Sequence, residues 1–175
     1  MHTSWPYGAS VSLSVALPTS APCPDLRLRL RMPSWLPAPV QVSLDGAALG
    51  AGAPGTYFEA SPFAASGGAH ALALSLPMAP SSALYAGSTQ ISGFKRYSFL
   101  FGPVLLSAQG PWDSRTDSLV MPPGLDPTNP GALLVPAGDG NALHFNVSGA
   151  PGFTFKPYWE VQEAGELFSN YPCFQ

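Results

Sequence analysis

Short segments in which every second residue is apolar recur along this sequence, and they limit the fold more than any other feature. The segments are SVSLSVAL (10–17), LRLRLRM (26–32), VQVSL (40–44) and HALALSL (70–76). A period of two places one face of a β-strand in a core and leaves the other face to solvent. The 21 prolines and 18 glycines among 175 residues favour turns over long helices. The sequence therefore predicts an all-β fold, an antiparallel, jelly-roll-like β-sandwich with long Pro/Gly-rich loops.

The stretch KRYSFLFGPVLLSA (95–108) is expected to lie at the centre of the core. Its first half alternates, whereas VLL after the break is apolar on both faces and must be covered on both. Pro103 has no N–H with which to extend a central ladder, and Gly102 can adopt the backbone angles of a bulge. We therefore expect Gly102-Pro103 to form a corner between two short strands.

Three parts of the chain differ in the strength of this pattern. We expect residues 1–108 to form the main β-sandwich. Residues 109–140 contain GPWDSRTDS and MPPGLDPTNPG, show little periodicity and are expected to form a long loop or insertion. Residues 141–175 return to alternation and are assigned as closing strands of the same domain, with the aromatic run from Phe153 to Val161 as a terminal strand pair.

Charge and hydropathy argue against two classes of partner. The formal net charge is −3, and no basic cluster offers a surface to nucleic acid or to an anionic membrane, so we expect neither as a partner. Arg27, Arg29 and Arg31 alternate with leucines and are expected to form a solvated strand face. No apolar run approaches the ~20 residues that span a bilayer. The N-terminus shows no convincing signal peptide, which leaves the localisation unknown.

The sequence shows no catalytic or metal-binding motif, and we predict no catalytic, cofactor-binding or metal-binding residue in this chain. It has no G-x-S-x-G elbow. His70 and His144 are far apart and are expected to have surface or loop-packing roles. Glu160, Glu163 and Glu166 are interpreted as a solvated cluster. Whether Cys23 and Cys173 form a disulfide is left open.

Aromatic side chains are the remaining candidates for ligand contact, because a flat ring can stack on the face of a sugar. Trp112 lies in a polar loop and Trp35 follows Pro33-Ser34 at the end of a strand. Both are named as candidate carbohydrate-contacting residues. For Trp35, the interpretation that the ring caps the core of the sandwich is preferred.

Four motifs in a fixed order resemble one known family. They are LRLRMPSW (28–35, within the stretch from Leu26 to Trp35), VQVSLDGAAL (40–49), LSLPM (74–78) and KRYSFLFGPVLLSA (95–108). They look like the non-catalytic C-terminal β-sandwich of the β-L-arabinofuranosidase-type glycoside hydrolases, glycoside hydrolase family 127. The motif positions that carry the likeness are Arg31, Pro33, Trp35, Gly46, Tyr97, Phe99, Gly102 and Pro103. Asp45 stands where the family usually has Asn before the glycine, and the tail FKPYWEVQEAGELFSNYP matches more loosely.

The resemblance implies an accessory role and no chemistry of this chain's own. The family's activity resides in a helical (α/α)6 barrel, normally in the same chain, with a zinc-bound cysteine nucleophile; zinc is thus a cofactor of the barrel. None of the barrel's motifs is present here, so no catalytic residue is transferred. The expected partner is that barrel, and the chain alone is expected to be an inactive domain or fragment of a glycoside hydrolase. The alternative kept open is a free-standing carbohydrate-binding or interaction module, which makes a glycan a second candidate partner.

Overall fold

The computed structural model describes residues 1–17, 26–60, 68–87, 90–114, 116–165 and 167–175. Nearly all regular structure in these residues is β, with antiparallel pairing between the named strands, so the all-β prediction is confirmed. The contacts divide the chain into two compact units, Met1–Met78 and Ala79–Gln175. The sequence grouped residues 1–108 as the main sandwich, whereas the division in the structure falls between Met78 and Ala79.

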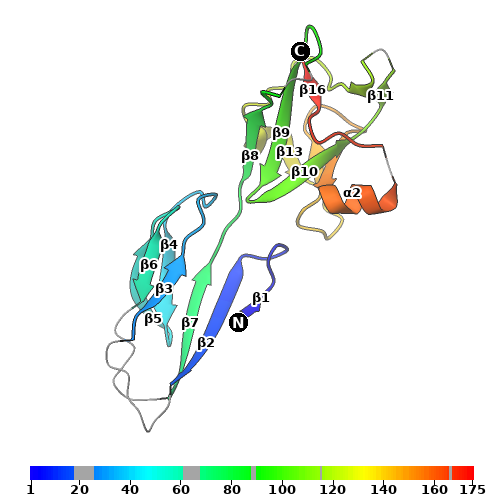
Figure 1. Ribbon diagram of the computed structural model, residues 1–175. Coiled ribbons are helices and arrows are strands. Elements are labelled where there is room, and N and C mark those ends of the chain that lie inside the picture. Colours follow the sequence, from blue (N-terminus) through cyan, green and yellow to red (C-terminus); the bar gives the residue numbers. More distant parts are fainter. Residues whose placement is uncertain (18–25, 61–67, 88–89, 115, 166) are drawn as a thin grey trace. The chain divides into compact units, whose positions relative to one another are not determined.

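The first unit contains seven strands among its described residues. They are β1 (His2–Thr3), β2 (Ser10–Leu17), β3 (Leu28–Arg31), β4 (Val40–Leu44), β5 (Ala47–Gly52), β6 (Tyr57–Ala60) and β7 (Gly68–Ser75). Five of them form a sheet in the order β1-β2-β7-β4-β5, and β3 pairs with β6 in a second sheet (Figure 1). Each strand predicted from alternation in this part of the chain is present.

The buried residues of the first unit come from both of its sheets. Met32, which follows β3, and Ala60 of β6 are buried with Val42 of β4 and Leu72 of β7. The inward leucines of β3 pack against the same cluster. Because one apolar cluster is shared by two sheets, this unit is a small β-sandwich.

Asp45-Gly46 forms the tight turn between β4 and β5, as its sequence predicts. Both residues have positive φ, 50° and 84°, which is the combination that a two-residue hairpin turn of type I′ requires. Asp45 tolerates this conformation better than most residues, because the short polar side chain can bond to nearby backbone. Its Oδ1 accepts a hydrogen bond of 2.7 Å from the N–H of Ala71.

The second unit is built around one sheet, in the order β13-β14-β15-β10-β9-β16 with β8 also on β9 (Figure 1). Its strands are β8 (Pro80–Leu84), β9 (Lys95–Phe101), β10 (Val104–Gln109), β13 (Leu134–Pro136), β14 (Phe145–Val147), β15 (Thr154–Pro157) and β16 (Cys173–Phe174). A separate hairpin pairs β11 (Trp112–Asp113) with β12 (Ser118–Leu119). Two short helices, α1 (Pro130–Leu133) and α2 (Tyr158–Ala164), complete it.

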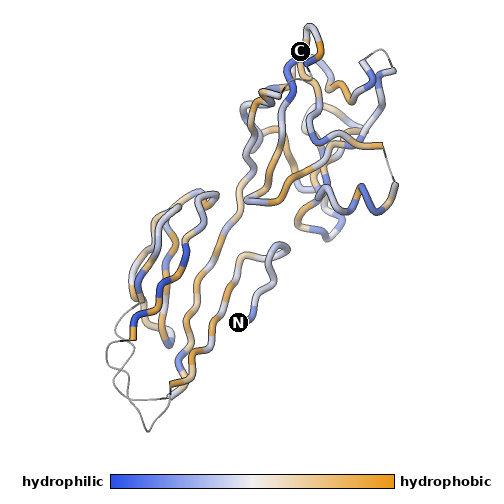
Figure 2. Tube along the Cα trace, viewed as in Figure 1, coloured by the Kyte–Doolittle hydropathy of each residue, from blue (hydrophilic) through white to orange (hydrophobic). Residues whose placement is uncertain are grey.

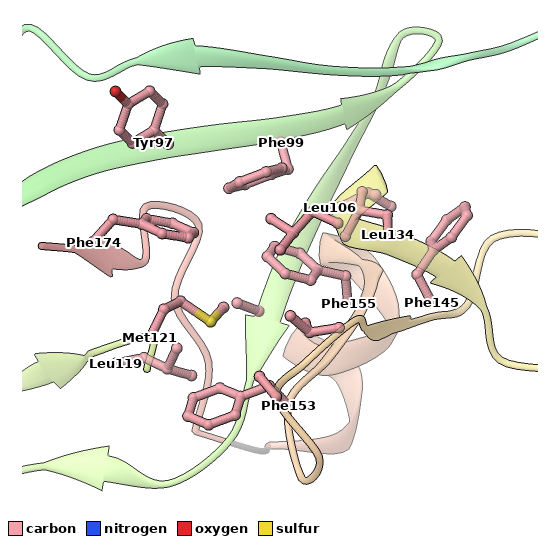
Figure 3. Close-up of a cluster of buried hydrophobic side chains, with 14 of the residues drawn as sticks. Tyr97, Phe99, Leu106, Leu119, Met121, Leu134, Phe145, Phe153, Phe155 and Phe174 are labelled. Atoms are coloured by element: carbon pink, nitrogen blue, oxygen red, sulfur yellow. The ribbon is translucent and has the colours of Figure 1, made fainter. Parts of the chain in front are cut away.

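The stretch 95–108 lies at the centre of this second unit, as predicted. Phe99 and Leu106 are fully buried and face each other across β9 and β10. Figure 3 shows these two side chains among the rings of Phe155 and Phe174. Gly102-Pro103 is a two-residue hairpin turn and not the predicted corner, because Phe101 pairs with Val104 and the chain reverses there. Gly102 has φ of 58°, which suits the first central position of a type II′ turn.

The prediction of a terminal strand pair from Phe153 to Val161 is wrong in its second half. β15 ends at Pro157, and Tyr158–Ala164 is the helix α2. Pro157 supplies no N–H to a ladder, and the residues that follow include good helix formers such as Glu160 and Gln162. Gly165 then ends the helix with a left-handed φ of 67°. Residues 109–140, expected as a long loop or insertion, contain β11, β12, α1 and all of β13.

Candidate functional site

A hollow beside the β11–β12 hairpin is one place where the second unit could hold a ligand. It has a volume of about 500 Å³, and its lining includes Trp112, Asp113, Ser114 and Phe153. The indole ring of Trp112 is half-buried and packs against the core. Its Nε1–H donates to Oδ1 of Asp117 at 3.3 Å, which fixes the orientation of the ring. The hollow therefore combines a flat aromatic wall with a carboxylate and a hydroxyl group, the groups that sugar recognition uses.

Trp35 lies against the core of the first unit. It is half-buried and packs against the apolar cluster of the first unit. Met32, three residues before Trp35, is fully buried in the same cluster. The two candidate tryptophans therefore lie in different units.

The other motif residues have structural positions. Tyr97 and Phe99 are buried in the core of the second unit, where both rings contact Phe174 (Figure 3). Gly46 and Gly102-Pro103 form hairpin turns. Arg31 ends β3 with its side chain on the exposed face, over the ring of Tyr57 at 5.2 Å.

Asp139, His144 and Glu160 form a cluster that the sequence did not predict. The imidazole Nδ1 lies 2.6 Å from Oδ2 of Asp139, and Nε2 lies 2.5 Å from Oε2 of Glu160. Asn141 supports the arrangement through its backbone N–H, which donates to Asp139 at 3.0 Å, and its side-chain Oδ1, which accepts from the N–H of Leu143 at 2.9 Å. The cluster joins the turn before β14 to the first turn of α2.

The charges in this cluster reinforce one another. Partial burial alone would lower the pKa of His144, but the hydrogen bonds to Glu160 and Asp139 outweigh it and raise that pKa above its ordinary value. The hydrogen bond from His144, followed by that from the Asn141 N–H, lowers the pKa of Asp139. Both ring nitrogens are hydrogen-bonded to carboxylates on opposite sides. Neither nitrogen is therefore free to act as a general base or to bind a metal ion. The geometry is that of a clamp between a turn and a helix.

Two features hid this clamp from sequence reasoning. Glu160 was expected in a solvated cluster with Glu163 and Glu166, whereas its side chain is only 26% exposed and is bonded to His144; Glu166 lies outside the described residues. The helix α2, which turns Glu160 toward His144, was predicted as a strand. An Asp-x-Asn turn five residues before the histidine is the signal that could have indicated a local partner.

His70 is placed in a similar but simpler way. Its Nδ1 lies 2.8 Å from Oδ2 of Asp45, which is in the β4–β5 turn. This hydrogen bond, and then the one from the Ala71 N–H, lowers the pKa of Asp45. The pair thus holds β7 to the turn, which is a loop-packing role.

The two cysteines are the remaining candidate residues. Cys173 is buried as a free thiol, with Sγ 3.5 Å from Oγ of Ser118, and Cys23 lies outside the described residues. Within the described ranges, no group of His, Cys, Asp and Glu side chains is arranged to hold a metal ion. No helix in these ranges is both long enough and apolar enough to cross a bilayer.

Comparison with known proteins relates the chain to others by fold alone. No family model matches the sequence, and no curated protein matches it. Among solved structures, a protein described as "Glycoside hydrolase" matches with a TM-score of 0.63 and 14% sequence identity. The match covers 99% of this chain but 31% of that one. The chain therefore has the fold of a region of a glycoside hydrolase and spans about a third of that protein's length.

Proposed function

We propose that this chain is a non-catalytic accessory β-sandwich region of a glycoside hydrolase related to the β-L-arabinofuranosidases of family 127. Its role is to pack against and support a catalytic (α/α)6 barrel. The observation that carries this proposal is the structural match, which takes in 99% of this chain and 31% of a glycoside hydrolase. The order of the motifs from LRLRMPSW to KRYSFLFGPVLLSA supports the narrower assignment to family 127.

The side chains with the strongest hydrogen-bond networks support a structural role. The carboxylates of Asp139 and Glu160 are both occupied by His144, and that of Asp45 is occupied by His70. Most glycosidases use two carboxyl groups that flank one open site, whereas these three carboxylates are bonded to histidines. In this proposal the acid, the nucleophile and the zinc all belong to the barrel.

The test compares the chain with the rest of such an enzyme. The purified 175-residue chain, a family 127 barrel lacking its own sandwich, and the two together are each assayed with an aryl β-L-arabinofuranoside. We expect no turnover by the chain alone and a more soluble, more thermostable barrel when the chain is present. Turnover by the chain alone would overturn the non-catalytic role, and a barrel unchanged by the chain would overturn the supporting role.

A second candidate function is carbohydrate binding by the hollow at Trp112. The observation in its favour is the combination of a half-buried indole with Asp113 and Ser114 around a volume of about 500 Å³. Titration with arabinan and arabinogalactan should then show saturable binding that Trp112→Ala abolishes. Trp35→Ala is the matched control, because that ring packs on the core of the other unit; equal loss with either variant would count against the hollow.

A further inference from the structure

We propose that the outer face of β3 and β6 binds a polysaccharide that carries carboxylate groups. Within residues 1–78 every lysine and arginine lies in one short segment, as Arg27, Arg29 and Arg31. This concentration of positive charge is notable in a chain of net charge −3. The inference does not depend on the accessory role proposed above, because binding can be measured on this chain by itself.

The strand places the arginines on one exposed face. Leu28 and Leu30 are half-buried and pack on the core, while Arg29 and Arg31 between and after them are exposed. Figure 2 shows this alternation as blue and orange along β3. Alternate residues of a strand are about 6.8 Å apart, so the guanidinium groups form a row on the solvent side. The side chains of Arg27 and Arg29 are each 71% exposed.

One carboxylate on the neighbouring strand is shared between two of these arginines. Glu59 pairs with Arg29 in the register of β3 and β6. Its Oε1 lies 3.3 Å from Arg27 Nη1, and its Oε2 lies 3.5 Å from Arg29 Nε. Exposed ion pairs of this length contribute little free energy. A guanidinium group has five N–H donors, so both arginines keep donors for the carboxylates of a ligand.

Tyr57 adds an aromatic surface to the same face. It lies opposite Arg31 in the register and is 61% exposed. The guanidinium carbon of Arg31 lies 5.2 Å from the centroid of its ring, a contact that holds the ring in place through cation–π attraction. A ring held on one side by a cation, and largely open to solvent, can stack on the apolar C–H face of a sugar.

A uronic acid unit matches both halves of this surface. Its carboxylate suits the forked donors of arginine, which recognise planar anions better than lysine does. Its ring suits Tyr57. Duplex DNA is a poorer match, because its dense phosphate charge favours broad basic surfaces, whereas the basic groups of this face are three arginines in one short segment. We therefore assign an acidic polysaccharide as the ligand, and DNA becomes an outcome of the test.

The experiment titrates the full chain calorimetrically with polygalacturonate and with the same polymer after reduction of its carboxyl groups. We expect saturable binding to the first alone, weakened about tenfold between 0.05 and 0.5 M NaCl by screening. Arg29→Gln should weaken binding about fivefold and Tyr57→Ala about threefold. Arg31→Lys, which keeps the charge but loses the fork, should weaken binding about twofold.

Lys95→Gln is the matched control. It removes one positive charge from an exposed position of the second unit and should leave the affinity unchanged. Circular dichroism establishes that each variant is folded, and Arg27→Gln, which lies before β3, replaces Arg29→Gln if that variant is not. Four results would overturn the proposal: no binding to polygalacturonate, equal binding to the reduced polymer, an equal effect of Lys95→Gln, or tighter binding to duplex DNA.

Discussion

Replacing Phe155 with alanine should remove a large part of the stability of the second unit. Phe155 is fully buried in β15, and its ring centroid lies 4.9 Å from that of Phe99. Truncation of a buried phenylalanine to alanine costs about 3–5 kcal/mol through lost burial and the cavity that remains. The tilted ring pair is worth about 0.5–1.5 kcal/mol beyond burial, which puts this site in the upper half of that range. A domain is stable by only about 5–15 kcal/mol in total.

Urea unfolding followed by far-ultraviolet circular dichroism measures this loss. The midpoint should fall while the slope of free energy against urea stays the same, since the change alters stability and not the surface exposed on unfolding. Phe155→Leu, which refills part of the cavity, should cost about 1–2 kcal/mol. Leu84→Ala is the control, because Leu84 lies in β8 of the same sheet but is 58% exposed. A loss below about 1 kcal/mol for Phe155→Ala, or an equal loss for Leu84→Ala, would refute the placement of Phe155 in the core.

Three further predictions concern the clamp and the turns. His144→Gln should flatten the pH dependence of the melting temperature. Because the pKa of His144 is raised in the folded protein, its contribution to stability is complete below the unfolded-state pKa near 6.5 and is lost as pH rises through the higher folded-state pKa. The pKa of Asp139 is lowered, so its contribution to stability is lost as pH falls below the ordinary pKa of 3.8. His2→Gln, at an exposed position, is the control and should leave the melting temperature as in the wild type at both acid and neutral pH. Gly46→Ala should lower the free energy of unfolding by about 1 kcal/mol, because φ is 84° there, although an added Cβ would meet no atom. Gly131→Ala, where an added Cβ also meets no atom but the residue is in α1, should raise the free energy of unfolding by about 0.5 kcal/mol. Equal effects of the two substitutions would contradict the argument from backbone conformation.

The strands of the first unit could be predicted because their signal is local. In β2, β4 and β7 the alternation of apolar residues with small or polar ones indicates which face is buried. The turn at Asp45-Gly46 was predicted for the same reason, since the dipeptide itself prefers the backbone angles found there.

The structure of the second unit depends more on contacts between distant residues. A period of two cannot show that Tyr158–Ala164 forms a helix and not a strand. Pro157 and Gly165 mark the ends of the segment, and tertiary packing decides between helix and strand within it. The strands of residues 109–140 are two or three residues long, too short to produce a periodic pattern. The Asp139–His144–Glu160 clamp in turn requires α2, so it was missed together with the helix.

The most direct test of the account is the hydrolysis of an aryl β-L-arabinofuranoside by the purified chain, by a family 127 barrel without its sandwich, and by the two combined. The account predicts no turnover by the chain, because it assigns the acid, the nucleophile and the zinc to the barrel. It also predicts a more soluble barrel with a higher melting temperature once the chain is added. Turnover by the chain alone, at a rate that scales with its concentration, would contradict the claim that this is an accessory region of a glycoside hydrolase.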